Sequence, residues 1–100
     1  MSKFEDEMDS LLEKSTRFWL LQQIRIILKQ LRSDLGLTQA EVAEKLGKDQ
    51  VFVSNCESGR RRIDPIELLA FATAYETTVE EILNSLNLEE AKKRDYGPLG

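Results

Sequence analysis

The side chains of this chain that could do chemistry are amides, hydroxyls and charged groups, because histidine is absent and Cys56 is the single cysteine. A disulfide framework, a Cys/His zinc site and Ser-His-Asp or Cys-His catalysis within one chain are therefore excluded. The sequence also has no paired acid-base constellation and no phosphate-binding loop, so we expect neither an enzyme activity nor a cofactor or metal. The chemistry that is left is hydrogen bonding and charge.

One short segment, residues 50–58, holds uncharged side chains that could face outward together. They are Val51, Ser54, Asn55 and Ser58, with Gln50 at the exposed N-terminal edge. If this segment is a helix, Val53 and Cys56 share its inner face, and positions 51, 54, 55 and 58 fall on the opposite face at about 100° per residue. An ordinary surface helix carries Lys and Glu there. Small uncharged polar side chains suit hydrogen bonding in the major groove of DNA instead.

The formal net charge of −4 hides an uneven distribution of charge along the chain. Residues 1–15 carry a net −3, residues 16–62 a net +4 and residues 63–100 a net −5. The basic block ends in the run Arg60-Arg61-Arg62. A basic block between acidic flanks is typical of a nucleic-acid-binding surface, although an arginine run alone is equally typical of a solvated loop.

Length and composition predict one small helical domain to position these residues. The chain has 100 residues, of which 41% are hydrophobic and 32% charged. No stretch reaches the roughly 18 apolar residues that a membrane span needs, and no basic-then-apolar leader opens the chain. We therefore expect no membrane association and a cytoplasmic location, where a single unpaired cysteine stays reduced.

Five helices are predicted between about residues 17 and 87, joined by short loops and without a competing strand pattern. The first carries apolar residues at steps of three and four and stops at Gly36. These apolar residues are Ile24, Ile27, Leu28, Leu31 and Leu35. The second helix opens with a capping box from Thr38 to Glu41 and ends at Gly47. The third is capped by Asp49 and stops at Gly59.

The last two helices have the same kind of start. Asp64 caps the fourth helix, Pro65 takes its first position and Glu67 completes a capping box. Its predicted core residues are Ile66, Leu69, Ala70 and Ala74. Thr78 and Glu81 predict a third capping box. The helix that follows is predicted to run through Ile82, Leu83 and Leu86.

Several segments occur in a characteristic order between about Ile24 and Leu83. They are Leu31-Arg32-Ser-Asp-Leu-Gly36, Leu37-Thr-Gln-Ala-Glu-Val-Ala-Glu-Lys-Leu-Gly47, Val53-Ser54, Glu57, Gly59, the arginine run and Thr78-Val-Glu-Glu-Ile-Leu83. This series covers about three-fifths of the chain and resembles the lambda-repressor/Cro-like helix-turn-helix family, also called XRE. The resemblance implies an all-α fold, a five-helix lambda-repressor-like DNA-binding domain with an N-terminal helical extension. The expected boundaries are 1–20 for the extension, 21–88 for the domain and 89–100 for a polar C-terminal tail.

The resemblance implies a role for each matched position. The positions that read bases correspond to Gln50, Val51, Ser54 and Asn55. The positions that bind phosphate correspond to Arg32, Thr38, Gln39, Arg60, Arg61 and Arg62. The implied partner is double-stranded DNA, and the implied function is a sequence-specific transcriptional regulator, most simply a repressor, that binds a palindromic operator as a homodimer. Three departures from the family pattern occur, at Val51, at Cys56 and at Tyr75-Glu76.

Several of these residues also have a structural interpretation. Arg32 could brace the fold and Arg61 could pair with the acidic helix that follows it. Glu57 is expected to pair with the first helix or to cap the next loop rather than to touch DNA. For Phe52, packing and base contact are equally supported, and Cys56 is expected to be a core residue rather than a redox switch. For Gln50 the alternative is that a polar residue is common at the start of a helix and has no further role.

The first twenty residues lie outside the resemblance. On one predicted face lie Met8, Leu11 and Leu12, and a dense apolar run follows at Phe18, Trp19, Leu20 and Leu21. This segment is expected either to pack on the domain or to form a dimer surface, and the other dimer candidate is the last helix, with Ile82, Leu83, Leu86 and Leu88. The acidic, aromatic extension also supports an alternative function, an antitoxin or other protein-interaction module that binds a small protein partner and regulates its own operon.

Overall fold

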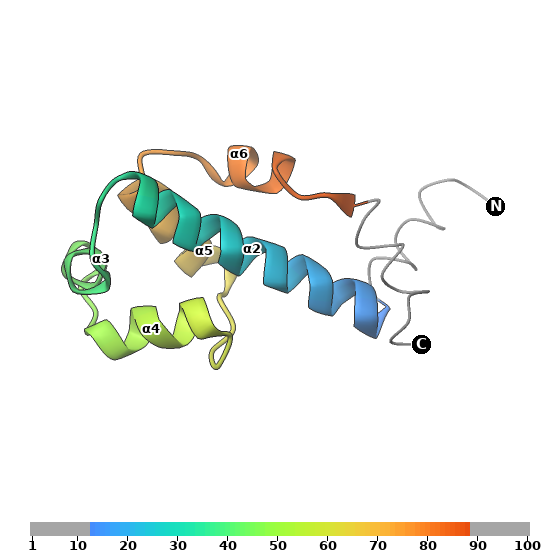
Figure 1. The fold of residues 1–100 in the computed structure, drawn as a ribbon, viewed down its shortest axis with the longest axis horizontal. Helices are drawn as coiled ribbons and strands as arrows, with labels where there is room; N and C mark the ends of the chain where they lie inside the picture. Colours follow the sequence, from blue (N-terminus) through green and yellow to red (C-terminus); the bar gives the residue numbers. More distant parts are fainter. Residues whose placement is uncertain (1–12, 89–100) are drawn as a thin grey trace. The chain divides into compact units, whose positions relative to one another are not determined.

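The computed structural model describes residues 13–88, and these residues form five α-helices and no strand (Figure 1). The helices are α2 (Lys14–Asp34), α3 (Gln39–Leu46), α4 (Gln50–Ser58), α5 (Pro65–Ala74) and α6 (Val79–Asn84). The all-α prediction is confirmed. None of these helices combines the length and the hydropathy of a membrane-spanning segment.

The chain divides into two compact units, Ile24–Ser85 and a second unit made of 1–23 with 86–100. Within the described part of the second unit, the Gln23 amide donates to the Asn87 carbonyl at 3.2 Å and accepts from the Asn87 N–H at 2.7 Å. Phe18 and Trp19 meet edge to face, with ring centroids 5.7 Å apart. Three apolar residues assigned to the extension, Met8, Leu11 and Leu12, lie outside the described residues, and the predicted domain boundaries stay predictions.

The helix ends of the larger unit follow the residues that punctuate the sequence. Thr38 accepts a hydrogen bond from the Glu41 N–H while the Glu41 carboxylate accepts one from the Thr38 N–H, which makes the predicted capping box. Asp64 and Glu67 form a second box, with Pro65 in the first turn of α5. Both boxes are confirmed.

The predicted box at Thr78 is wrong in one of its two bonds. The Thr78 hydroxyl accepts from the Glu81 N–H at 3.1 Å, as predicted. The Glu81 carboxylate, however, does not accept from the Thr78 N–H as a capping box requires. It accepts instead from the hydroxyl of Thr77, one residue before the cap, at 2.7 Å. The helix also ends at Asn84, so that Leu86 lies beyond it.

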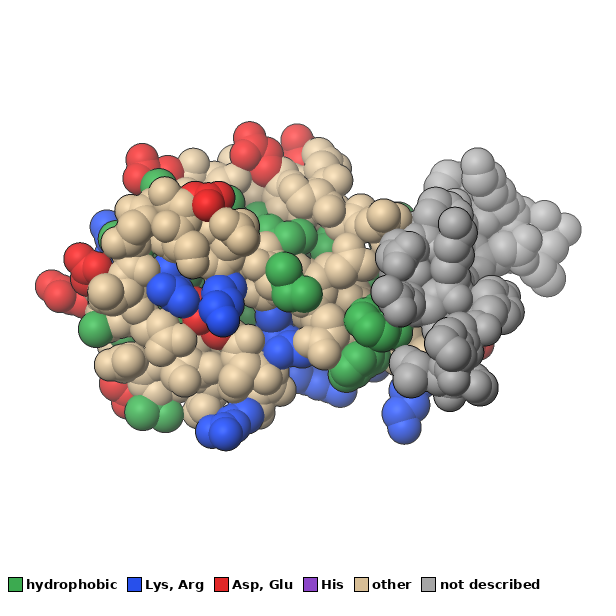
Figure 2. Space-filling model, in the orientation of Figure 1, with side chains coloured by type: hydrophobic (Ala, Val, Ile, Leu, Met, Phe, Trp, Pro, Cys, Tyr) green, Lys and Arg blue, Asp and Glu red, His purple; other side chains and the backbone are tan. Residues whose placement is uncertain are grey.

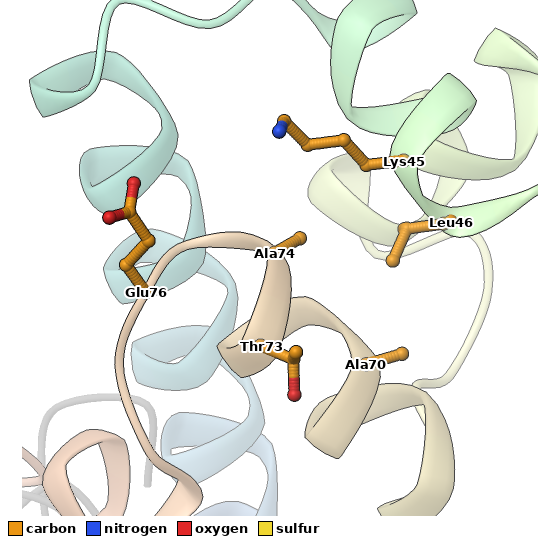
Figure 3. Close-up of a pocket in the computed structure, with 6 residues that line it drawn as sticks. All are labelled: Lys45, Leu46, Ala70, Thr73, Ala74 and Glu76. Atoms are coloured by element: carbon orange, nitrogen blue, oxygen red, sulfur yellow. The ribbon is translucent and has the colours of Figure 1, made fainter.

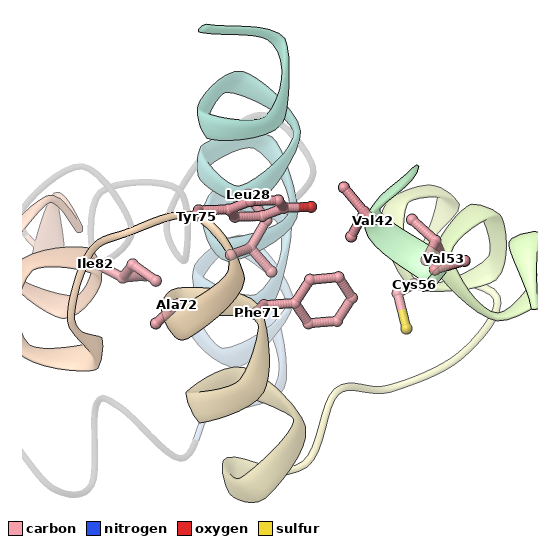
Figure 4. Packing of buried hydrophobic residues seen from close by; sticks show 9 residues of the cluster. Leu28, Val42, Val53, Cys56, Phe71, Ala72, Tyr75 and Ile82 are labelled. Carbon is pink, nitrogen blue, oxygen red and sulfur yellow. The ribbon is translucent and has the colours of Figure 1, made fainter. Parts of the chain in front are cut away.

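The core of the larger unit collects side chains from every helix. Phe71 of α5 reaches toward Val42 of α3 and toward Val53 and Cys56 of α4 (Figure 4). The other members of the cluster are Leu28, Ala43, Ala72, Tyr75 and Ile82. Leu35, which was assigned to the apolar face of the first helix, is 42% exposed because α2 ends one residue before it.

The predicted core face of α5 is wrong for three of its four residues; the fourth, Ala74, packs against the core cluster. Ile66 and Leu69 are 73% and 53% exposed, and Ala70 is exposed as well. Phe71 and Tyr75 are buried instead, on the other side of the helix. α5 carries apolar residues on both sides, so spacing alone left two possible faces, and the structure buries the one that holds the two aromatic rings.

Candidate nucleic-acid interface

A fixed turn joins α3 to α4. Gly47 lies in the left-handed region at φ 68°, and its N–H bonds to the carbonyls of Ala43 and Glu44 at the end of α3. The Lys48 N–H donates to the Ala43 carbonyl at 2.9 Å, and the Asp49 carboxylate then accepts from the Phe52 N–H at 2.9 Å to cap α4. The turn therefore has a bonded backbone at each step, which fixes the angle at which α4 leaves α3.

The four predicted base-reading residues lie on the accessible side of α4. Val51 is 63% exposed, Gln50 is exposed, and Ser54 and Asn55 are partly exposed. Val53 and Cys56 are buried on the opposite side, as the helical phase predicted. Within the described part of the chain, the side chains of the three polar residues make no hydrogen bond, so their amide and hydroxyl groups are available to a ligand.

A buried ion pair fastens α4 to α2. Arg32 donates from Nε to Glu57 Oε2 at 2.6 Å and from Nη2 to Oε1 at 3.0 Å, and the two side chains are 14% and 6% exposed. Gln39 of α3 donates to the same carboxylate at 2.9 Å. The expected pairing of Glu57 with the first helix is confirmed, and its hydrogen bond raises the pKa of Arg32.

This arrangement bears on two predicted phosphate contacts. Arg32 also donates to the Leu37 carbonyl at 2.9 Å, so all of its described bonds point into the domain. The structure therefore favours the brace as the interpretation of Arg32. The amide of Gln39 is likewise engaged by Glu57, whereas Thr38 stands exposed at the start of α3.

A second pair holds the loop after α4. Arg61 donates to Glu67 Oε1 at 2.6 Å, and this bond is the first cause of the lowered pKa of Glu67. The Arg61 guanidinium also lies 4.8 Å from the ring centroid of Phe52, which stacks on Phe71 at 6.3 Å with an angle of 9°. Lys48 approaches the same ring at 5.4 Å. Phe52 is therefore a packing residue. Arg61 forms the pair with the acidic helix that was the structural alternative to a phosphate contact.

Arg60 and Arg62 differ from Arg61. Both are exposed, and neither has an ion pair among residues 13–88. In Figure 2, Lys and Arg side chains gather around α4 and the loop that follows it, whereas Asp and Glu side chains are more frequent near α6. The basic charge thus borders the neutral polar face of α4.

Sequence reasoning missed a contact between α2 and the end of α4. The side chain of Arg25 lies directly over Gly59, where a Cβ atom would be 2.5 Å from Nη1 and 2.6 Å from Cζ. Gly59 also takes a φ of 83°, which L side chains rarely adopt. The turn glycine was recognisable from the sequence, but its contact with a residue 34 positions earlier was not.

Neither the groove on the surface of the domain nor the thiol of Cys56 forms part of this candidate interface. A groove of about 490 Å³ lies between α3 and α5, with Lys45 and Glu76 on opposite sides (Figure 3), and no predicted base or phosphate contact lines it. Cys56 is 1% exposed and burial raises the pKa of its thiol, as in a core residue.

The two predicted dimer surfaces are only partly accessible. In α6, Ile82 is buried in the core while Leu83 is exposed; beyond the helix, Leu88 is exposed too. Phe18 is half exposed near the start of α2. The outer face of α5, with Ile66 and Leu69, is a further exposed apolar surface that the sequence had assigned to the core.

Comparison with known families agrees with this geometry. Residues 23–84, more than half of the chain, match the helix-turn-helix domain family. The match spans α3, the turn and α4 together with the helices that pack on them. A comparison with curated proteins gives no match. The chain belongs to the helix-turn-helix domain family.

Proposed function

We propose that this protein is a sequence-specific DNA-binding transcriptional regulator, most simply a repressor, that binds a palindromic operator as a homodimer in the cytoplasm. The observation that carries the proposal is the outer face of α4. The side chains of Gln50, Ser54 and Asn55 make no hydrogen bond within the described residues, and two arginines without a carboxylate partner there follow the helix. A surface of this kind complements base edges beside a phosphate backbone.

In this proposal α4 enters the major groove and reads bases with four side chains. Gln50 and Asn55 carry amides that can bond to N6 and N7 of adenine, and each good bidentate contact discriminates by about 1–3 kcal/mol. Ser54 donates or accepts, and Val51 contacts a thymine methyl group. The Arg32–Glu57 pair does not touch DNA; it holds α4 at a fixed angle so that these four side chains arrive together.

Phosphate contacts supply the affinity that does not depend on sequence. Arg60 and Arg62 are exposed and able to approach the backbone, and the exposed start of α3 at Thr38 offers amide groups and the positive end of a helix dipole. To read both half-sites of a palindromic operator, two such domains related by a two-fold axis have to present their α4 helices about 34 Å apart, one DNA turn. The proposed homodimer has to meet this requirement.

Selection of binding sites from random DNA at two salt concentrations tests the proposal. We expect an enriched inverted repeat with half-site centres about 10 bp apart and weaker retention at higher salt. Asn55→Ala should weaken binding to the selected site by about 1–3 kcal/mol while binding to random duplex is nearly unchanged. Asn84→Ala, which removes the same amide from an exposed position at the end of α6, is the control. Equal losses on both duplexes for Asn55→Ala would contradict base reading.

A second candidate function is a protein-interaction module, such as an antitoxin, that binds a small protein partner. The observation that favours it lies in the smaller unit, where Phe18 and Trp19 line a hollow of about 370 Å³ with Glu13, Lys14 and Ser15. Co-purification of a small basic partner under non-dissociating conditions, lost in Phe18→Ser, would support it. A clean homodimer that binds DNA without such a partner would count against it.

A further inference from the structure

We propose that Arg25 is a further phosphate-binding residue, which lies in the space over Gly59 beside the arginines that follow α4. The inference rests on the proposed DNA-binding function and adds a contact from α2, a helix to which the sequence assigned Arg32 alone. It follows from the position of one guanidinium group, from the absence of a carboxylate that neutralises it in the described part of the chain, and from the residue type at position 59.

The position of Arg25 depends on the missing side chain at Gly59. A Cβ atom there would lie 2.5 Å from Nη1, 2.6 Å from Cζ and 3.1 Å from Nε, so three of the guanidinium atoms occupy the space of a side chain. Any other residue at position 59 would push the guanidinium away. The glycine therefore leaves the space in which Arg25 lies against the last turn of α4, directly before Arg60 in the chain.

Arg25 differs from Arg32 in having no ion pair within the described residues. The two residues are seven positions apart on one helix, so both face α4. Arg32 is neutralised by Glu57, and Arg61 by Glu67. Among residues 13–88 no carboxylate lies within 4 Å of Arg25, although its side chain is partly buried. A guanidinium without an ion pair can donate charge-assisted hydrogen bonds to a phosphate.

The structure also offers a competing explanation for this contact. The C-terminal end of a helix is electronegative, and a cation beside it stabilises the helix. That explanation predicts a loss of stability when Arg25 is replaced and no change in the number of ions released on DNA binding. Phosphate binding predicts a change in ion release, which is measured by the salt dependence of the affinity.

The test compares Arg25→Gln with Lys45→Gln on DNA. Lys45 lines the groove between α3 and α5, which holds no predicted base or phosphate contact, and it is exposed without an ion pair in the described residues. Lys45→Gln therefore removes an equal charge from another part of the same domain. Affinities are measured on the selected site and on a random duplex of equal length between about 50 and 200 mM salt. Thermal unfolding shows whether each variant is folded, and Arg25→Met, which keeps the apolar stem, provides a second variant.

For Arg25→Gln and Arg25→Met we expect the slope of log K against log salt to become shallower by about 0.9, with a loss of about fivefold to tenfold at 0.1 M salt on both duplexes. Lys45→Gln should keep the wild-type slope. Wild-type slopes in folded Arg25 variants, or an equal change in Lys45→Gln, would overturn the assignment of Arg25. If wild-type protein binds neither duplex, the proposed function itself fails, which separates the two outcomes.

Discussion

The outer faces of α4 and α5 are opposite in character although both helices pack one side on the same core. α4 turns amides and hydroxyls outward beside Val51, whereas α5 turns Ile66 and Leu69 outward. α4 is held by a buried ion pair in addition to its apolar contacts, and α5 by two aromatic rings. The two helices are therefore oriented in different ways. Hydrogen-bonded charges fix the angle of α4 relative to α2, whereas the burial of its largest side chains orients α5.

The largest expected effect tests the orientation of α5. Phe71→Ala removes a ring that is 1% exposed and should lower the free energy of unfolding by about 3–5 kcal/mol, because it leaves a cavity in the core. Leu69→Ala, on the outer face of the same helix, should change it by less than about 0.5 kcal/mol. Urea denaturation measures both. A large loss for Leu69→Ala would mean that its face is buried in solution.

The next effect tests the ion pair that orients α4. Glu57→Ala leaves the buried Arg32 guanidinium and the Gln39 amide without their acceptor, and the free energy of unfolding should fall by about 3 kcal/mol. Glu44→Ala, an exposed carboxylate on α3, is the control. DNA binding by the folded fraction should also weaken, since α4 loses its fixed angle. A loss similar to that of Glu44→Ala would show that the pair contributes little.

The same two helices show how much the sequence could predict. The face of α4 was predictable because Ser54 and Asn55 lie opposite Val53 and Cys56 around the helix, although Val51 lies beside the polar pair, and because its ends are marked by a capping residue and a glycine. The face of α5 was not, because apolar residues occur on both of its sides and periodicity then gives two equivalent answers. The decision depended on which side chains filled the space left by Leu28 and Val42.

Contacts between distant residues set the limit for the candidate site. The residue types on α4 and in the loop after it could be predicted as the candidate interface from sequence alone. That Arg32 and Arg61 are already paired, and that Arg25 lies over Gly59, depends on distances across the fold. Local rules of capping and helical phase do not contain this information, because the two partners of each contact lie on different helices or loops.

A smaller effect sharpens the comparison at the ends of the two helices. α4 ends at Gly59, whose backbone is in the left-handed region. After α5 the residue in that conformation is Glu76, at φ 58°. The Thr77 N–H reaches the Ala72 carbonyl at 2.9 Å and the Glu76 N–H reaches that of Thr73 at 3.2 Å, a bond pattern that requires this conformation.

Glycine adopts that conformation without the penalty that a Cβ atom brings. Glu76→Gly should therefore raise the free energy of unfolding by about 1 kcal/mol, measured by urea denaturation. The matched control is Gly47→Ala, which has open space around its Cα and should lower it by about the same amount through the backbone alone. A destabilised Glu76→Gly variant would show that its side chain contributes more than the strain costs.

The smallest effect concerns pH and the start of α5. The hydrogen bond from Arg61 and that from the Asp64 N–H lower the pKa of Glu67 in the folded protein. A lowered pKa means that the folded state holds its proton less tightly than the unfolded state, in which the pKa is about 4.3. The stability that Glu67 contributes is therefore complete above that value and is lost as the pH falls through the folded pKa.

Glu67→Gln should be less stable than wild type at neutral pH and should approach wild type at low pH, because the amide cannot form the charged pair at either. α4 provides the contrast, since Phe52 stands at the position that Glu67 occupies in α5 and its cap has a single arm. Urea denaturation of both proteins between neutral pH and about pH 3 measures the difference. If the gap between them stays constant over this range, the carboxylate of Glu67 acts through its shape and hydrogen bonds and not through its charge.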